Sequence, residues 1–471
     1  MKQPPQENFS GRILMLGCGL IGQAILPLLL RHLAVSAARI QVLTGDERGR
    51  EVARKYEVGF TVAPLTPANF GDILTPLLEP GDFLLNLSSD VASCELLELC
   101  GALGVLYLDT CIDSWKSEVY DSRLSVSERS LYALRDRALA YRARCAPGHP
   151  TAVLAHGANP GLVSHFVKQA LWNLARLDAP ATPKPQTREQ WAALSRALGI
   201  KAIHIAERDT QISSARKMPG EFVNTWSIDG LVGEAMQPAE MGWGSHERHF
   251  PADGACHAFG DQSGIYLNLP GAAVKVRTWL PLAGPQIGFL ITHNESLSIA
   301  SYLTLGEGAQ PEYRPTVHYA YHPSDDALLS LYEFQERNWV LQERLRPVND
   351  CLVSGIDELG VLLIGNARGV YWYGSRLSVE QARELAPHNS ATSLQVAAGT
   401  LAGMVWAMRH PRAGIVEAEQ MDFEEVLAIA LPYLGEMAGE FGNWNPLAGR
   451  NELFPEDIDT SDPWQFKNLR V

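Results

Sequence analysis

Cysteine is scarce in this sequence and is never clustered. The seven cysteines are scattered, and no two of them form a Cys-x-x-Cys pair. Structural zinc sites usually need such pairs, so this class of site is excluded. An odd number of unclustered cysteines is also typical of a reducing compartment. We therefore expect a cytoplasmic protein.

Basic residues are also few. The 39 Lys and Arg stand against 53 Asp and Glu, which gives a formal net charge of −14. A protein that binds nucleic acid needs a basic surface to neutralise phosphates, so we expect no nucleic-acid partner. One uncharged run, residues 13–30, resembles a signal peptide or a membrane span in length, but glycines interrupt it. We expect this run to be a buried strand, turn and helix, and we expect no membrane partner.

Short β-rich runs alternate with helical segments over residues 1–156. The expected strands span residues 12–16, 40–43, 59–62, 82–87, 105–109 and 151–156, and the expected helices span residues 20–33, 47–56, 67–78, 91–103 and 125–145. Apolar strands that alternate with helices predict a doubly wound parallel sheet. The predicted fold class is α/β, with a Rossmann-type first domain over residues 1–156.

The composition changes after a proline-rich loop at residues 180–185. Residues 201–373 are strand-like and dense in Trp, Tyr, Gly and Pro, which predicts a mixed or antiparallel sheet. We expect residues 157–387 to form a second, α+β substrate domain. Residues 390–410 predict a long apolar helix, buried between domains or subunits. Residues 388–471 are expected to pack back against the first domain.

A Gly-x-Gly-x-x-Gly pattern follows the first expected strand and precedes the first expected helix. Its members are Gly17, Gly19 and Gly22, and Leu20 and Ile21 lie between them. The first glycine allows a tight turn, the second lets a pyrophosphate approach the backbone, and the third allows close helix packing. We therefore expect these five residues to bind a dinucleotide.

The end of the second strand leaves the choice between NAD and NADP open. An acid is expected there to bind the adenine ribose, but Thr44 occupies the position and Asp46 follows two residues later. Arg48 and Arg50 can instead meet a 2′-phosphate. We favour NAD, with Thr44 and Asp46 at the ribose.

Polar side chains follow two later strands, at the edge where open sheets bind their ligands. Ser88, Asp109 and Thr110 are expected near the cofactor, whereas Asp90 and Asp113 can reach a substrate. Each of the latter two can equally be a helix cap or a turn residue.

Residues 218–247 contain no Lys or Arg, but they hold five carboxylates and two tryptophans. Carboxylates bind an organic cation by charge, and aromatic rings bind it by their quadrupole. This window therefore predicts an amine site. Trp226 can equally be a core residue, and Glu240 can belong to the site or to the structure. Glu234 is the strongest candidate.

Two further segments gather reactive side chains. Glu207 lies in a β-like segment among charged neighbours, and His293 lies in the polar run 292–296. A histidine in such a run is often structural, so the run alone assigns no role. His318 and His322 have the spacing of helical metal ligands, but no clear third ligand stands nearby, so we expect no metal.

Seven segments together resemble bacterial homospermidine synthase, a family of the wider saccharopine-dehydrogenase-like group. They are residues 17–22, 157–161, 204–210, 222–226, 237–244, 292–296 and 454–464. The likeness spans nearly the whole chain, and the later segments are long enough to be specific. It implies a homodimer, NAD held as a recycled group, and putrescine as substrate, with spermidine left open as a further donor.

The resemblance also implies roles for individual residues. Active-site roles fall on Asn159, Glu207, Trp226, Glu234 and His293, with acidic substrate positions at Asp90 and Asp113. Asn159 is expected to serve the cofactor as well. The chain departs from the family pattern at Asp113, where a longer Glu is expected, and at Thr44, where an acid is expected.

The implied reaction is a redox-neutral condensation of two putrescines. Hydride leaves the carbon beside a neutral amine, ammonia is displaced, and the hydride returns to give homospermidine. Neighbouring carboxylates favour ammonium, so a base is needed, and the ordinary pKa of His293 suits that role.

Two alternatives remain open. A net NAD(P)-dependent amine or amino-acid dehydrogenase of the saccharopine type would need basic residues for its substrate carboxylates. Arg208, Arg277 and Arg314 lie outside the cation-free window and can supply them. A nucleotide-sensing regulator is disfavoured by the clustered His, Asn and carboxylates.

Overall fold

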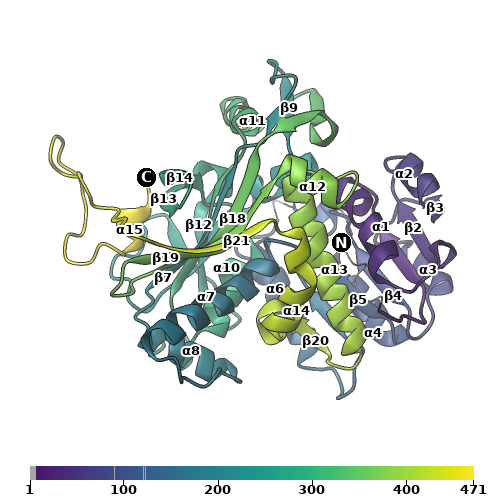
Figure 1. Cartoon of the computed structure of the whole chain (residues 1–471), viewed down its shortest axis with the longest axis horizontal. Helices are drawn as coiled ribbons and strands as arrows, with labels where there is room; N and C mark the ends of the chain where they lie inside the picture. The colour runs from purple at the N-terminus through teal and green to yellow at the C-terminus, as the bar shows by residue number, and fades with distance from the viewer. Residues whose placement is uncertain (1–6, 90, 120, 122) are drawn as a thin grey trace.

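Two β-sheets organise the chain (Figure 1). The computed structural model describes residues 7–89, 91–119, 121 and 123–471. The first sheet and its helices form the purple N-terminal side in Figure 1, and the second sheet forms the larger teal and green part. The structure is α/β, as the alternation of segments predicts.

In the described part of the chain, the first sheet has seven parallel strands in the order β20-β6-β5-β4-β1-β2-β3. They are β1 Ile13–Leu16, β2 Ile40–Thr44, β3 Gly59–Val62, β4 Phe83–Asn86, β5 Leu106–Asp109, β6 Ala152–Leu154 and β20 Ile415–Glu417. Ile13 and Met15 pack into one core cluster, whereas Leu14 and Leu16 pack into another. Both faces of β1 are thus covered, which explains its uninterrupted apolar run.

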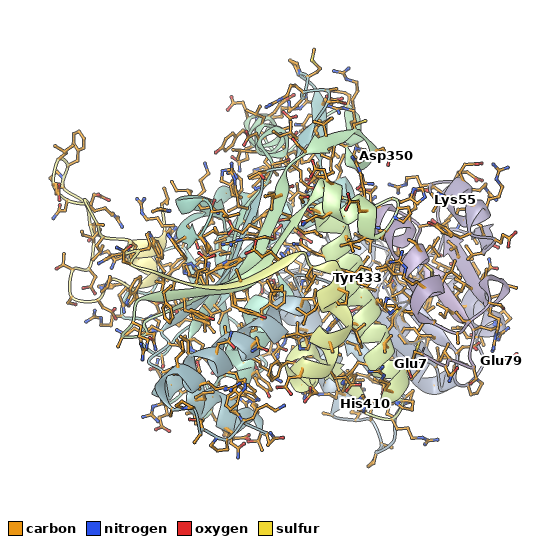
Figure 2. The ribbon with its side chains drawn as sticks, viewed as in Figure 1. Glu7, Lys55, Glu79, Asp350, His410 and Tyr433 are labelled. Atoms are coloured by element: carbon orange, nitrogen blue, oxygen red, sulfur yellow. The ribbon has the colours of Figure 1, made fainter. Side chains whose placement is uncertain are left out.

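Helices flank this sheet. They are α1 Leu20–His32, α2 Arg50–Lys55, α3 Phe70–Leu74, α4 Ser93–Leu103, α5 Lys116–Val119 and α6 Leu131–Arg142, with short 3₁₀ turns at η1 Ala37–Arg39 and η2 Thr75–Leu77. Charged side chains such as Lys55 and Glu79 cover the outer rim (Figure 2). No helix in the described ranges is both long enough and apolar enough to cross a membrane.

The second sheet is mixed and has ten strands within the described residues. They are β7 Ala202–Asp209, β10 Pro238–Gly242, β11 Gly254–Cys256, β12 Gly264–Pro270, β13 Lys275–Leu280, β14 Gly284–Phe289, β15 Thr316–His322, β18 Ile356–Ile364, β19 Val370–Ser378 and β21 Glu436–Gly442. β15 pairs with β7 in parallel, and β18 pairs with β7 antiparallel. These three central strands carry the reactive side chains described below.

The remaining elements surround the second sheet or connect the two sheets. The helices are α7 Leu162–Asp178, α8 Arg188–Ala197, α9 Ile228–Met236, α10 Asn294–Tyr302, α11 Asp325–Glu336, α12 Val379–Leu385, α13 Ala391–Arg409, α14 Phe423–Ala430 and α15 Phe466–Leu469. Short strands and 3₁₀ turns complete the chain at β8 Ile212–Ser213, β9 Glu221–Asn224, β16 Arg344–Pro347, β17 Leu352–Ser354, η3 Gly271–Ala273, η4 Asn349–Cys351, η5 Ala418–Gln420 and η6 Leu431–Tyr433.

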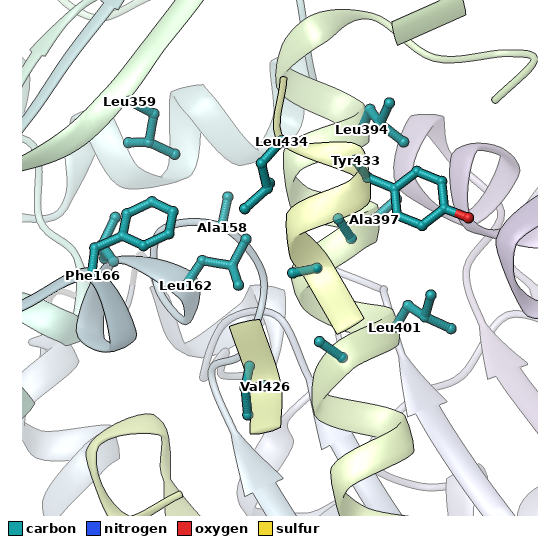
Figure 3. Packing of buried hydrophobic residues seen from close by; sticks show 14 of the residues in the cluster. Ala158, Leu162, Phe166, Leu359, Leu394, Ala397, Leu401, Val426, Tyr433 and Leu434 are labelled. Atoms are coloured by element: carbon teal, nitrogen blue, oxygen red, sulfur yellow. The ribbon is translucent and has the colours of Figure 1, made fainter. Parts of the chain in front are cut away.

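α13 is the long buried helix that the apolar run 390–410 predicts. The Ser390 side chain caps its first turn by accepting from the Ser393 backbone N–H. α13 packs on α1 and β5 of the first domain and on α14 and β19 on its other sides. Leu394 and Leu401 belong to the same buried core cluster as side chains of α7 and α14, and in Figure 3 they lie on the side of α13 away from the labelled α7 and α14 residues. One helix therefore joins the cores of both sheets.

The C-terminal region is divided between the two sheets. β20 extends the first sheet beside β6, whereas β21 pairs with β19 in the second sheet. The expectation that residues 388–471 pack back against the first domain is therefore wrong for the part from β21 onward. β21 pairs there because the outer edge of β19 offers backbone groups that no other described strand of the sheet pairs with.

Candidate active site

A cleft of about 230 Å³ lies at the carboxyl ends of β1, β2 and β4. Gly17 has φ +87°, a region that favours glycine, and a Cβ there would lie 2.8 Å from the Leu87 carbonyl oxygen. A Cβ on Gly19 would meet nothing within 4 Å, whereas one on Gly22 would lie 2.8 Å from the Gly17 carbonyl oxygen. The first glycine turns the chain, the second leaves open space and the third allows packing, so this cradle fits a pyrophosphate.

The far end of the cleft holds Thr44 and Asp46, as expected for the adenosine side. Arg48 is already engaged there: its Nε donates to Asp46 Oδ2 at 2.7 Å, and its Nη1 donates to Asp229 Oδ2 at 3.4 Å. Arg50 pairs with a neighbouring glutamate and lies outside the lining of the cleft. Two carboxylates beside Arg48 oppose a 2′-phosphate, which is itself an anion.

Three other predicted cofactor residues lie in or near the cleft. Ser88 lines it, whereas Leu20 and Ile21 are the first two residues of α1. Thr110 follows β5 directly. Asp90, which was predicted to reach the substrate, lies outside the described residues.

Asp109 departs from the expected cofactor role. It is 1% exposed, and its Oδ1 accepts from the Ala155 backbone N–H at 2.6 Å while its Oδ2 accepts from the Tyr107 hydroxyl at 2.8 Å. Burial raises its pKa to about 6, although these hydrogen bonds oppose the shift. Its carboxyl therefore bridges β5 to the loop after β6 and is absent from the lining of the cleft.

The substrate role of Asp113 stays a prediction. Its backbone N–H donates to Ser93 Oγ at 3.1 Å, which fixes the loop to the start of α4. Burial, Asp113 and Glu234 together raise the pKa of the Cys111 thiol well above its usual value. The charges of Asp113 and Glu234 thus act on the same thiol.

Glu207 lies on β7, with both of its oxygens removed from solvent. Its Oε2 accepts from Asn159 Nδ2 at 2.8 Å and from the Tyr319 hydroxyl. Burial raises its pKa to about 7, and the charge of Asp209 acts in the same direction. The hydrogen bonds from Tyr319 and Asn159 and the charge of the nearby His293 act in the opposite direction. A carboxyl that is half ionised near neutral pH suits proton transfer.

Two more buried carboxyls adjoin Glu207. Asp357 on β18 is in register with Asp209 on β7, and its carboxyl adjoins that of Glu207. Burial and the charges of Glu207 and Asp209 raise the pKa of Asp357 well above its usual value, against a hydrogen bond from Thr392. Three adjacent buried carboxyls cannot all ionise, so this cluster holds at least one proton.

His293 lies between two carboxylates. Its Nε2 is 3.0 Å from Glu234 Oε2, and its Nδ1 is 3.2 Å from Glu295 Oε1. Burial opposes a charge on the ring, but the two carboxylates outweigh it and hold the pKa of His293 well above its usual value. Both carboxylates therefore favour the protonated ring, an imidazolium without a free nitrogen lone pair. This arrangement disfavours His293 as the resting base, and the identity of the base stays a prediction.

Trp226 is anchored and only partly buried. Its Nε1 donates to the Tyr321 hydroxyl at 3.1 Å. Tyr321 stacks on Tyr319 with ring centroids 5.3 Å apart, and the Tyr319 and His293 rings lie 4.4 Å apart. A row of rings thus connects Trp226 to the imidazolium, and the indole is held in place at one end of it.

Comparisons with known proteins agree with this geometry. Residues 13–153 match the model of the saccharopine dehydrogenase NADP binding domain, and residues 157–443 match that of the saccharopine dehydrogenase C-terminal domain. The homospermidine synthase of Blastochloris viridis is 48% identical over 477 residues, which cover 99% of each chain. The chain belongs to the homospermidine synthase family.

Two further members of the homospermidine synthase family support the assignment. The enzyme of Mesorhizobium japonicum (strain LMG 29417 / CECT 9101 / MAFF 303099) is 45% identical over 482 residues, 99% of this chain and 98% of the relative. The crystal structure of the homospermidine synthase from Legionella pneumophila in complex with NAD has a TM-score of 0.92 at 44% identity and covers 99% of both chains. The resemblance read from the sequence motifs is confirmed.

Within this member of the homospermidine synthase family, the cation-free window divides by role. Glu234 reaches His293, whereas the other four carboxylates have structural partners. Glu221 pairs with Arg346 at 2.8 Å, Asp229 pairs with Arg48, Glu240 accepts from the backbone N–H groups of Leu131 and Tyr132, and Glu247 accepts from Thr316 and the Phe466 backbone N–H. The window is one wall of the site rather than a general cation trap.

Sequence reasoning missed Tyr319, Tyr321 and Asp357 in this homospermidine synthase family site. The alternation of Tyr319 and Tyr321 on one strand was a signal that both side chains share a face. Asp357 gave no such signal, because only the pairing of β18 with β7 brings it to Glu207. In the described part of the chain, no three His, Cys, Asp or Glu side chains form a group that could hold a metal ion.

Proposed function

We propose that this member of the homospermidine synthase family condenses two molecules of putrescine to homospermidine and releases ammonia, with NAD as a bound hydride carrier. Full-length similarity to named homospermidine synthases supports the reaction. The glycine cradle supports a dinucleotide, and Asp46 and Asp229 beside Arg48 support NAD over NADP. When bound, NAD takes a hydride from the carbon beside the reacting nitrogen and later returns it.

One observation carries the proposal. Ser227 and Asp229, at the start of α9, line the cofactor cleft, and Glu234 on the same helix lies 3.0 Å from His293. Seven residues of helix span about 10 Å. This spacing supports a single site in which the dinucleotide cleft adjoins the carboxylate wall.

Glu207 is the proposed base. Hydride loss requires a neutral amine, and a carboxylate with a pKa of about 7 can take a proton from an ammonium that is held against it. Asn159 fixes the Glu207 carboxylate by donating to its Oε2. Asp209 and Asp357 adjoin Glu207, and we propose that the ionised members of this cluster bind the ammonium before Glu207 accepts its proton.

The remaining residues stabilise the cation that hydride transfer creates. The resulting iminium carries its charge next to the reacting carbon, where we propose that Trp226 and Glu234 face it. A cation–π contact contributes about 0.5–2 kcal/mol. Asp113, and Asp90 beyond the described residues, are proposed to bind the outer ammonium of the diamine.

One experiment separates this proposal from a net amine dehydrogenase. The protein is incubated with putrescine and substoichiometric NAD⁺, and ammonia, homospermidine and NADH are measured. Many turnovers per NAD with no accumulation of NADH are expected. Stoichiometric NADH without a condensation product would overturn the proposal. Replacing half of the putrescine by spermidine tests whether spermidine also donates.

We also propose a homodimer in the cytoplasm. The seven cysteines are all free, which suits a reducing compartment. Leu282, Ile287 and Tyr332 are exposed apolar side chains around a surface cavity of about 780 Å³, and a second copy can cover them. Light scattering at several concentrations tests the dimer; a monomer at all concentrations would contradict it.

A further inference from the structure

Glu295 has a carboxylate oxygen that the described site leaves unused. Its Oε1 faces His293 Nδ1, whereas its Oε2 meets no hydrogen-bond donor among the residues that the structure describes. The side chain is 1% exposed. A buried carboxylate oxygen is strongly favoured to have a donor, so its surroundings indicate a second partner.

A small cavity borders Glu295. Its volume is about 10 Å³, and Asn294, Ser164 and Ser298 also line it. One water needs about 10–15 Å³ and two to four polar partners. Both serine hydroxyls donate to Glu419 Oε1 at 2.7 Å, which leaves their oxygens able to accept. The cavity therefore has the size and the polar lining for one water.

Glu417 connects this cavity to the surface. It lines the small cavity and also a cavity of about 470 Å³, which is bordered by the exposed residues 306–308. Arg135 holds the Glu417 carboxylate in place with bonds of 2.6 and 2.9 Å. Neither cavity shares a lining residue with the cofactor cleft.

We propose that Glu295 relays protons between His293 and solvent. The route runs through a water in the small cavity and then past Glu417 into the larger cavity that Glu417 also lines. The proposal rests on the proposed function, in which His293 and Glu234 face the reacting diamine. The described lining of the cofactor cleft shares no residue with this line, so the line gives the site a separate route for proton exchange.

The proton transfer proceeds in balanced steps. The Nδ1–H bond of the imidazolium breaks and an O–H bond forms on Glu295, which leaves His293 neutral. Glu295 passes that proton to the water, and the water releases one of its own protons toward Glu417 and the solvent. The reverse order returns a proton when the product amine is protonated.

Substrate binding triggers the release. An ammonium bound to Glu234 neutralises one of the two carboxylates that stabilise the imidazolium, so the proton on His293 is held less tightly. Titratable groups adjoin this line along its length. Glu234, Glu207 and Tyr319 lie around His293, Cys111 is near Glu295, and Arg135, Glu419 and Lys168 lie around Glu417 and the two serines.

Two substitutions of Ser298 test the water site. Ser298→Thr keeps the hydroxyl and adds a methyl group that fills the cavity, whereas Ser298→Ala removes the hydroxyl and keeps the cavity open. With NAD-loaded full-length protein, NMR of labelled histidine measures exchange of the His293 ring proton with solvent. We expect slower exchange, by about tenfold or more, in Ser298→Thr alone. Slowing in Ser298→Ala but not in Ser298→Thr, or in neither, would overturn the relay.

Glu295→Gln separates relay from positioning, since Gln still accepts from His293 but cannot carry a proton. We expect kcat to fall by about tenfold or more while KM for putrescine changes little, and small buffer bases to restore the rate. A loss without rescue by buffer would reduce Glu295 to a structural partner. If the wild-type protein makes no homospermidine, the proposed function fails, but the exchange measurement still decides the relay.

Discussion

Replacing Tyr319 by phenylalanine should move the acid limb of the pH–activity profile to higher pH. The Tyr319 hydroxyl donates to Glu207 and stabilises its ionised form. A hydrogen bond to a charged group contributes about 1.5–3 kcal/mol, or roughly one to two pKa units. The pKa of Glu207, about 7 in the intact site, should therefore rise to about 8–9 in Tyr319→Phe.

The assay is kcat/KM for putrescine as a function of pH, since its acid limb reports the free enzyme. A carboxylate base must be ionised, so activity falls as the pH drops through its pKa. Asp209→Asn removes a neighbouring negative charge that raises the pKa of Glu207. The midpoint of the acid limb should therefore lie at lower pH in this variant than in the wild type. The two variants thus shift the midpoint in opposite directions.

Tyr321→Phe is the matched control. Its hydroxyl accepts from Trp226 rather than bonding to Glu207, so its midpoint should equal that of the wild type even if its rate falls. An unchanged midpoint in Tyr319→Phe, or an upward shift in Asp209→Asn, would refute the assignment of Glu207 as the base.

Three further predictions concern the cofactor, the indole and the carboxyl cluster. Trp226→Ala should lower turnover more than Trp226→Phe, and a cation–π contact sets the scale at roughly two- to thirtyfold; full activity in both would reduce Trp226 to a packing residue. Asp46→Asn should improve NADP relative to NAD by about threefold to tenfold, because Arg48 loses a carboxylate partner worth about 1 kcal/mol at this exposed position; titration with each cofactor measures the ratio, and an unchanged ratio counts against the assignment. Burial raises the pKa of Asp357 in the folded protein above its value in the unfolded chain. Its contribution to the free energy of unfolding is therefore complete below the unfolded-state pKa and is lost as the pH rises through the folded-state pKa. Asp357→Asn should therefore become more stable relative to the wild type as the pH rises, and melting curves that stay parallel across pH would contradict this.

The sequence predicted the first domain closely because its signals are local. Each expected strand of residues 1–156 overlaps an observed one, and the glycine pattern named two residues that line the cleft, Gly17 and Gly19. Apolar runs and turn residues report on their own neighbourhood, so strand pairing adds little to such a prediction.

The site of the second domain depends on contacts that the sequence does not display. Glu207, His293 and Trp226 were named from the family motifs, but their electrostatics were not. Asp357 and Tyr319 reach Glu207 only through strand pairing. The pKa of His293 likewise follows from two carboxylates on different elements, and one of them, Glu234, comes from α9.

α9 makes the two ligands depend on each other. Its first turn borders the dinucleotide and its last turn carries Glu234, and a short helix moves as a rigid lever. Any tightening of the dinucleotide end therefore repositions the carboxylate at the other end. We therefore expect a nucleotide bound at one end of α9 to change the affinity for a diamine at the other end.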